Sequence, residues 1–265
     1  MLLVRLFLCA VAVLYVVSGV AAAREYHVQA GAAADGDGSP SRPFETVQAA
    51  AAAMKPGDVC IIHAGVYRET IRPANSGTAD QPLVFRATDG EDVVINGCER
   101  VDDWRPAGDK MFRAAVKLSL DDGNQVFSGR QMLLEARWPN AGVPAPRDLL
   151  EYKWATMADG TTPTKIVDPQ LPSLDLAGAQ VWVSSHKRWY CWTGEVLASQ
   201  AGELQIKDNS DSKGNHICKP GGRYYVFGAK SLLDSPNEWY YDATAGELFV
   251  GGADDQTLPQ GGCAA

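Results

Sequence analysis

Positive charge is in short supply in this chain. Its 265 residues include 24 lysines and arginines against 32 aspartates and glutamates, so the formal net charge is −8. Nucleic-acid-binding domains gather lysine and arginine on one face or along one helix, and no segment of this sequence shows such a basic stripe. The sequence therefore predicts that nucleic acid is not a partner.

Compact catalytic and metal-binding signatures are also absent. There is no Gly-x-Ser-x-Gly nucleophile motif and no glycine-rich phosphate loop followed by Lys-Ser/Thr. Two His/Cys pairs have side chains of zinc-binding types, His186 with Cys191 and His216 with Cys218. Their spacing matches no common zinc site, and the aspartates in turns lack the spacing of a calcium-binding EF-hand loop. We therefore predict no metal site and no cofactor.

Long apolar runs are absent except at the start of the chain. Leu6–Val17 is unbroken and apolar, Arg5 precedes it, and Ala21-Ala22-Ala23 supplies small residues of the kind that signal peptidase reads. We predict a signal peptide over residues 1–23 and a secreted protein, extracellular or periplasmic, with no membrane span after cleavage. The alternative is an uncleaved anchor, although the run is short for a membrane span.

Helical patterning is confined to one short segment, and the rest of the chain favours β-structure. Thr46–Met54 is rich in alanine, the best helix former. Val47, Ala50, Ala51 and Met54 make one apolar stripe at helical spacing. Elsewhere, apolar and β-branched segments of three to five residues alternate with turns rich in glycine, aspartate and asparagine. This pattern predicts an all-β protein with one short helix.

The order of motifs in the first hundred residues narrows the fold. A glycine/aspartate loop leads into Ser39–Phe44, the alanine-rich helix follows, and Lys55–Asp58 and Ala64–Tyr67 flank an apolar strand. This order resembles the opening of secreted right-handed parallel β-helix proteins. The resemblance covers residues 25–104 and implies that the helix caps the open end of the first coils, where apolar core and strand edges need cover.

The second half of the chain resembles a different element of the same proteins. Tryptophan and tyrosine become frequent after Trp104, and the segments Glu135–Asn140 and Leu232–Asp242 are similar to the β-sandwich that some β-helix proteins insert after their first coils. We therefore predict a start of a parallel β-helix over residues 24–104, a β-sandwich-like domain over 105–252, and a tail over 253–265. Either the chain is part of a longer β-helix protein, or short stack and sandwich form one complete unit.

Five cysteines remain after the predicted cleavage, and secretion permits disulfides between them. A Cys191–Cys218 disulfide is expected in a secreted protein. The resemblance implies that Cys60 and Cys98 lie on neighbouring coils, which makes a second bridge between them an expectation. Cys263 is then left over, with a partner further along the chain if the protein continues.

Two groups of residues are candidates for contact with sugar. Glu135, Arg137 and Trp138 combine a carboxylate, a guanidinium and an indole, and the second group is His186, Trp189 and Trp192 in the densest aromatic and basic cluster of the chain. Aromatic rings stack on the CH faces of sugars. The alternative is that Arg137 pairs with an acid and that the tryptophans fill a core, as large aromatics commonly do.

The resemblance implies a carbohydrate-degrading function. The β-helix relatives include polysaccharide lyases and glycoside hydrolases whose catalytic residues, and in the lyases a calcium ion, lie on later coils. No position here matches them, so the catalytic residues stay unknown. We expect the N-terminal part of a secreted enzyme that is inactive alone, with a polysaccharide or oligosaccharide as partner. The alternative is a non-catalytic carbohydrate-binding or cell-envelope module.

Overall fold

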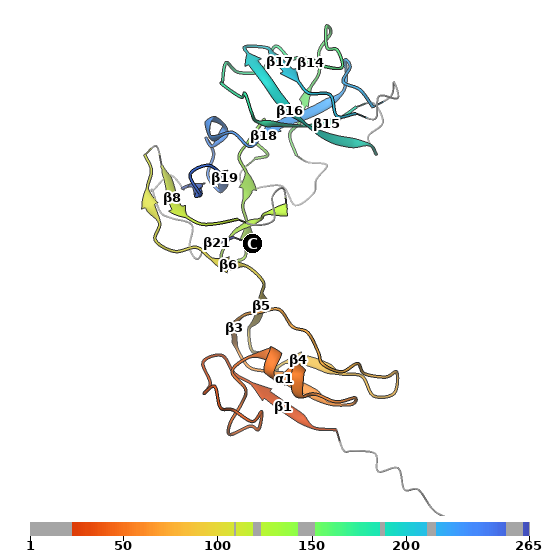
Figure 1. Ribbon diagram of the computed structural model, residues 1–265, viewed down its shortest axis with the longest axis vertical. Helices are drawn as coiled ribbons and strands as arrows, with labels where there is room; N and C mark the ends of the chain where they lie inside the picture. The colour runs from red at the N-terminus through yellow and green to blue at the C-terminus, as the bar shows by residue number, and fades with distance from the viewer. Residues whose placement is uncertain are drawn as a thin grey trace, which may run out of the picture. The chain divides into compact units, whose positions relative to one another are not determined.

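The fold is mostly β and is divided into two compact units. The computed structural model describes residues 23–108, 110–118, 123–142, 152–185, 189–210, 216–252 and 262–264. Unit 1 is Met1–Gly97 and unit 2 is Cys98–Ala265, and each is described by itself (Figure 1). The predicted signal peptide lies outside the described residues except for Ala23. Within the described part of the chain, no helix has the length and apolarity needed to cross a membrane.

Unit 1 is built from parallel strands. Its three-stranded sheet has the order β1-β2-β4 with both pairings parallel, and a separate parallel pair joins β3 to β5. The strands are β1 (Glu25–Val28), β2 (Val59–Ile62), β3 (Gly65–Arg68), β4 (Val84–Ala87) and β5 (Val93–Asn96). Parallel neighbours need a connection that returns the chain to the same end of the sheet. The helix lies in the connection from β1 to β2 (Figure 1).

The helix forms where the alanine-rich segment predicted it. α1 spans Val47–Ala53, and the Thr46 side chain caps its first turn by accepting from the Ala49 N–H at 3.1 Å. The Glu69 carboxylate accepts from two further N–H groups of that turn. The predicted stripe is fully buried and packs in a core with residues of β1, β2 and β3. Burial of this stripe, more than helix propensity, holds a helix of only seven residues.

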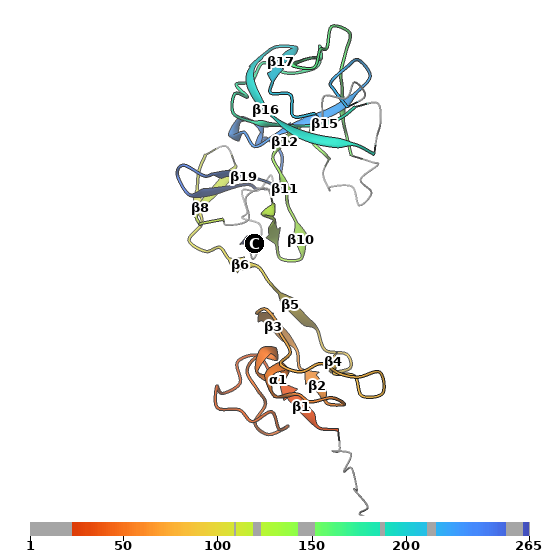
Figure 2. The same cartoon turned by 45° about the vertical axis from the view of Figure 1, so that its right-hand side comes forward.

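The described strands of unit 2 form three sheets. Strands of each of them are labelled in Figure 2. The four-stranded sheet has the order β10-β9-β21-β6, and its strands are Gln131–Met132, Val126–Ser128, Gly262–Ala264 and Glu99–Arg100. The five-stranded sheet has the order β11-β19-β20-β8-β7, and its strands are Leu134–Glu135, Glu238–Asp242, Glu247–Gly251, Met111–Ala115 and Arg105–Pro106. The antiparallel pair β19–β20 forms a hairpin, with Gly246 at a positive φ of 66° in its turn.

The seven-stranded sheet carries the larger core of unit 2. Its order is β12-β18-β15-β16-β17-β14, with β13 also paired to β18. The strands are Arg137–Trp138, Arg223–Phe227, Gln180–Ser184, Cys191–Gln200, Glu203–Ile206, Lys165–Val167 and Ala155–Thr156. A short 3-10 helix, η3 (Lys230–Leu232), follows β18. The two central strands β15 and β18 of the seven-stranded sheet project side chains into one core: Val181, Val183, Tyr224 and Val226. The opposite face of these strands carries the alternate side chains.

The cysteines correct the disulfide prediction. Cys60, Cys191 and Cys218 are free thiols, so neither the Cys60–Cys98 nor the Cys191–Cys218 bridge forms. Cys218 lies in the core below the seven-stranded sheet, whereas Cys191 is exposed and its neighbour Trp192 takes the core-facing position. Successive strand residues face opposite sides of a sheet, so Cys191 points away from Cys218. Cys60 is enclosed in the core of unit 1, while Cys98 belongs to unit 2.

Candidate functional site

A row of aromatic side chains lies on the seven-stranded sheet, on the face away from the core. Trp154, Trp182, Tyr225 and Phe227 follow one another with ring centroids 4.9, 5.3 and 5.5 Å apart. We call these four residues the aromatic row. All four are half-buried. A continuous row of rings that retains solvent access offers an extended apolar surface to a ligand, because the body of each ring is apolar.

Strand alternation and register place the two central rings. Trp182 is the middle residue of β15 and Tyr225 the middle residue of β18, and the two are direct partners across the antiparallel pair. Their neighbours Val183 and Tyr224 face the core with no exposed surface. Since side chains alternate along each strand, Trp182 and Tyr225 must share the outer face. Their rings are stacked, with an interplanar angle of 22°.

Arg137 is held against this row. It lies on β12 opposite Phe227 of β18, and its guanidinium carbon is 3.9 Å from the centre of the Tyr225 ring. Its Nε donates to the Pro139 carbonyl at 3.0 Å and its Nη2 to the Lys153 carbonyl at 2.8 Å. Burial lowers the pKa of Arg137 from its ordinary value, opposed by the nearby Tyr225 and Tyr152. A guanidinium remains protonated under such shifts, so the row carries a fixed, desolvated positive charge.

A groove begins where the aromatic row ends. It has a volume of about 950 Å³, within the range of small-molecule sites. The seven-stranded sheet contributes Gln180 and Phe227, and the five-stranded sheet contributes Glu135, Trp239 and Tyr241. Phe227 belongs to both the row and the groove, so together they form one surface of rings, amides and a carboxylate.

The segment Glu135-Ala136-Arg137 explains why the two sheets meet here. Glu135 pairs with Trp239 in the five-stranded sheet, and Arg137 pairs with Phe227 in the seven-stranded sheet. Ala136 between them is fully buried, and its N–H donates to the Trp239 carbonyl at 2.7 Å. The chain thus passes from one sheet to the other within three residues. This crossing brings the carboxylate of Glu135 and the guanidinium of Arg137 to the same surface.

A buried carboxyl group lies beside the same crossing. Glu238 is 4% exposed, and its Oε2 has no hydrogen-bond partner in the described part of the chain. Burial, with a further contribution from Asp234, raises the pKa of Glu238 to about 8, against the lowering effect of backbone N–H groups that include Arg137. Because desolvation disfavours the charged form, burial favours the neutral acid here, and the carboxyl group accepts from backbone N–H groups of the crossing.

The predicted sugar contacts are distributed over several places. Glu135 lines the groove and Arg137 supports the aromatic row. Trp138 packs against the core-facing Tyr224, with ring centroids 6.1 Å apart. Trp192 is 8% exposed in the core and donates to the His216 carbonyl at 2.8 Å, which corrects its assignment to a sugar platform. His186 lies outside the described residues.

Trp189 is separate from the aromatic row. It is 75% exposed and lies edge-on to Tyr190 and His216, whose rings stack on each other with centroids 3.7 Å apart. This second patch of rings has a different support, because Tyr190 packs partly against the core below. Trp189 is therefore a surface ring that can be changed without opening the core.

The sugar contacts predicted from the sequence include none of the four members of the aromatic row. The Trp154 ring lies tilted against the ring of Trp182, 28 residues further along the chain, and nothing local in the sequence indicates that contact. Alternation indicates that either Tyr224 or Tyr225 lies on the outer face, since the two must face opposite sides of one strand. The pattern does not say which of the two faces the core.

Comparisons with known proteins address the fold. A glycoside hydrolase of known structure aligns with a TM-score of 0.63 and 19% sequence identity, over 91% of this chain and 45% of that one. The complex of XylC with xylose aligns with a TM-score of 0.37 and 18% identity, over 86% of this chain and 32% of that one, a match too loose to bear on the argument. The chain thus shares its fold with less than half of the glycoside hydrolase.

The sequence comparisons are narrower. The uncharacterized protein YwoF of Bacillus subtilis (strain 168) is 36% identical over 61 residues, which amount to 23% of this chain and 13% of that protein. No family model matches the chain.

Proposed function

We propose that unit 2 binds a polysaccharide or oligosaccharide along the aromatic row and the adjoining groove, as part of a secreted carbohydrate-degrading protein. The observation that carries this proposal is the stacked pair Trp182 and Tyr225, continued by Trp154 and Phe227 and opening onto a groove of about 950 Å³. The solvent-accessible parts of these half-buried rings are apolar, so they can contact the CH groups of a sugar.

The polar groups around the row fit the rest of a sugar. Gln180 and Glu135 bring an amide and a carboxylate to the groove, and Tyr241 adds a phenol. Hydroxyl groups of a sugar both donate and accept, so they suit a mixed lining of this kind. The fixed positive charge of Arg137 behind Tyr225 would also favour a ligand with acidic sugars, although Glu135 opposes that preference in the groove.

The wider proposal is that unit 1 starts a right-handed parallel β-helix and that unit 2 is a β-sandwich-like insertion. It is supported by the parallel pairing of β1, β2 and β4, by the export signal expected from the sequence, and by the fold shared with a glycoside hydrolase. Hydrolysis by that class of enzyme needs two carboxyl groups about 5 to 10 Å apart. Glu135 is the one carboxylate among the described groove residues, so we assign this surface to binding and place bond cleavage elsewhere in the proposed enzyme.

The test is retention on immobilised glycans of different charge. The protein would be run on affinity gels containing a neutral β-glucan, a xylan, a polygalacturonate or an alginate. We expect at least one glycan to retard the wild type, and Trp182→Ala to lose that retardation while keeping its unfolding transition.

Trp189→Ala is the matched control, because it removes an equally large and more exposed ring that lies outside the aromatic row. Equal retardation of the wild type and Trp182→Ala would show that the row does not bind the glycan. Loss of retardation in Trp189→Ala alone would move the site to the Trp189 patch. The alternative prediction, a non-catalytic carbohydrate-binding module, gives the same result in this binding assay. Release of sugar products by this chain would argue against that alternative.

A further inference from the structure

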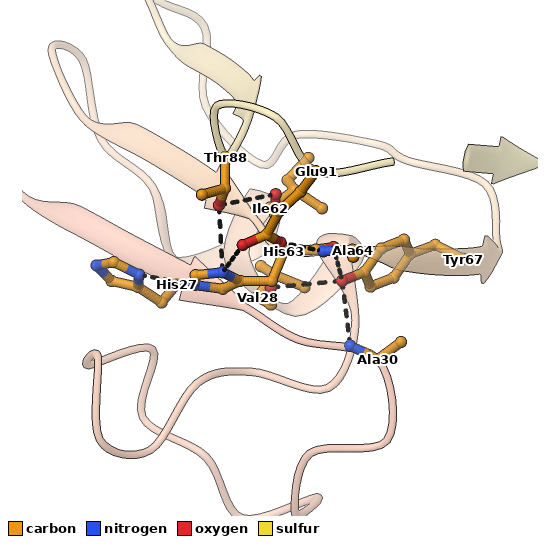
Figure 3. A network of polar contacts seen from close by, with 9 residues as sticks. All are labelled: His27, Val28, Ala30, Ile62, His63, Ala64, Tyr67, Thr88 and Glu91. Atoms are coloured by element: carbon orange, nitrogen blue, oxygen red, sulfur yellow. Dashed lines mark hydrogen bonds and ion pairs between the residues drawn. The ribbon is translucent and has the colours of Figure 1, made fainter. Parts of the chain in front are cut away.

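Two histidines of unit 1 lie close together on the outer face of its parallel sheet. His27 is on β1 and His63 directly follows β2. His27 Nδ1 and His63 Nε2 are 3.2 Å apart, and the rings are stacked with an interplanar angle of 20° (Figure 3). Both rings are half-buried, so they are ordered by the protein and still reach solvent.

The surroundings of His63 determine which of its nitrogens carries the proton. Its Nδ1 is 3.4 Å from Glu91 Oε1 and 3.2 Å from Thr88 Oγ1 (Figure 3). The carboxylate can only accept, and the Thr88 hydroxyl donates its proton to the Ile62 carbonyl. A proton on His63 Nδ1 would be shared between these two acceptors. In the neutral ring this leaves a lone pair on Nε2, directed at His27.

The strand ends that carry the two rings are fixed as well. The Tyr67 hydroxyl donates to the His63 carbonyl at 2.7 Å and accepts from the Ala30 N–H at 3.1 Å, which ties the residues after β2 to those after β1. Glu91 also accepts from the Ala64 N–H. Tyr67 is 3% exposed. The separation between the imidazoles is thus set by the fold and is not a chance meeting of two mobile side chains.

We propose that His27 and His63 form a binding site for a divalent transition-metal ion of the zinc class, with His27 Nδ1 and His63 Nε2 as the two protein ligands. Zn–N bonds of about 2.0 to 2.1 Å in a tetrahedral site place two ligand nitrogens about 3.3 Å apart, close to the 3.2 Å found here. The chain Glu91–His63–metal is the carboxylate–histidine–metal arrangement that orients ligands and makes them more basic.

The site leaves coordination positions open. Among the residues that the structure describes, no group of three or more His, Cys, Asp and Glu side chains is placed to hold a metal ion. The remaining positions would be filled by water or by a donor from a bound ligand. To bind a metal through Nδ1, the neutral His27 ring would carry its proton on Nε2, by exchange with solvent. Imidazole ligands favour zinc, copper and nickel over magnesium and calcium.

The experiment is a calorimetric titration of ZnCl₂ into protein that carries no polyhistidine tag and has been stripped with chelator. We expect saturable binding of one ion per chain in the wild type. His27→Ala and His63→Ala should each weaken it more than 10-fold, and Glu91→Gln should weaken it about 10- to 100-fold by removing the acceptor of His63 Nδ1. His216→Ala is the matched control, since His216 lies in unit 2, and it should bind as the wild type does.

Two results would overturn the proposal. One is the absence of saturable zinc binding in the wild type, which would leave the pair as a hydrogen bond between imidazoles. The other is wild-type affinity in both His27→Ala and His63→Ala. If an alanine variant loses its unfolding transition, His27→Gln and His63→Gln replace it, because an amide keeps a polar contact and lacks the imidazole. The proposal is independent of glycan binding, since the titration uses zinc alone.

Discussion

The guanidinium of Arg137 lies 3.9 Å from the centre of the Tyr225 ring, and two of its nitrogens donate to backbone carbonyls. The charged group therefore lies beneath the surface, where it binds two backbone carbonyls, and is hardly exposed to solvent. We expect Arg137→Met to lower the free energy of unfolding by about 2–4 kcal/mol, because it leaves the Pro139 and Lys153 carbonyls without these donors. Urea denaturation measures the change.

The control for this substitution is Arg113→Met. Arg113 forms an ion pair with Glu247 in which its own side chain is 47% exposed, and exposed pairs contribute about 0–1 kcal/mol. Equal effects of the two substitutions would contradict a supporting role for Arg137.

Glu238 should make stability fall as the pH rises. The pKa of its carboxyl is about 8 in the native protein against an ordinary value of 4.5. Below about pH 4.5 both native and unfolded states hold the proton, and between the two values only the native state does, so unfolding becomes easier with rising pH. Glu238→Gln should remove this slope and raise the free energy of unfolding at pH 7 by roughly 1–3 kcal/mol.

Denaturation curves at pH 4.5 and pH 7.5 test this expectation. Glu247→Gln provides the control, because its carboxylate is on the surface beside Arg113. A wild type and a Glu238→Gln variant with parallel pH dependence would show that Glu238 is ionised in the native protein.

Truncating two tryptophans three residues apart should change the stability of the protein by very different amounts. Trp192 is in the core and Trp189 is 75% exposed. Trp192→Ala should lower the free energy of unfolding by about 3–5 kcal/mol. Trp189→Ala should leave the free energy of unfolding within about 0.5 kcal/mol of the wild-type value. Thermal unfolding followed by circular dichroism distinguishes them, and a fully stable Trp192→Ala would place that ring outside the core.

Thiol reactivity should separate the cysteines. Burial raises the pKa of Cys60 and of Cys218 to about 12, and the thiolate is the reactive form. In the native protein a maleimide should modify Cys191, which is exposed, well before Cys60 or Cys218. Peptide mass mapping before and after unfolding locates the label. A Cys191 that stays unmodified until a reductant is added would restore the predicted disulfide.

Local residue patterns predicted helices and strands well where a pattern is compatible with only one kind of secondary structure. The alanine-rich stripe Val47 to Met54 became a buried helix face, and short apolar segments such as Glu247–Val250 became strands. In both segments the periodicity of apolar residues and the turn residues at their ends agree. The coarse all-β prediction follows from many such short segments.

The site was harder to predict because it depends on which face of a strand is covered. Alternation puts Trp182 on the opposite side of its strand from Val181 and Val183. Which of the two sides faces the core is decided by segments far away in the chain. Trp192 was chosen for the surface and lies in the core, since it is paired with Val183, a core residue of β15. The cysteine pairing failed for the same reason, because Cys191 and Cys218 are separated by the sheet itself.

The register between β15 and β18 has a consequence for any ligand of the aromatic row. The backbone ladder that pairs Trp182 with Tyr225 sets the distance between the two rings, and their own contact then limits how far either can turn. A ligand would meet rings that are already in position, so little side-chain entropy would be lost when it binds. The row would then favour ligands whose repeat length matches the distance between the rings, and the backbone hydrogen bonds between the two strands set that distance.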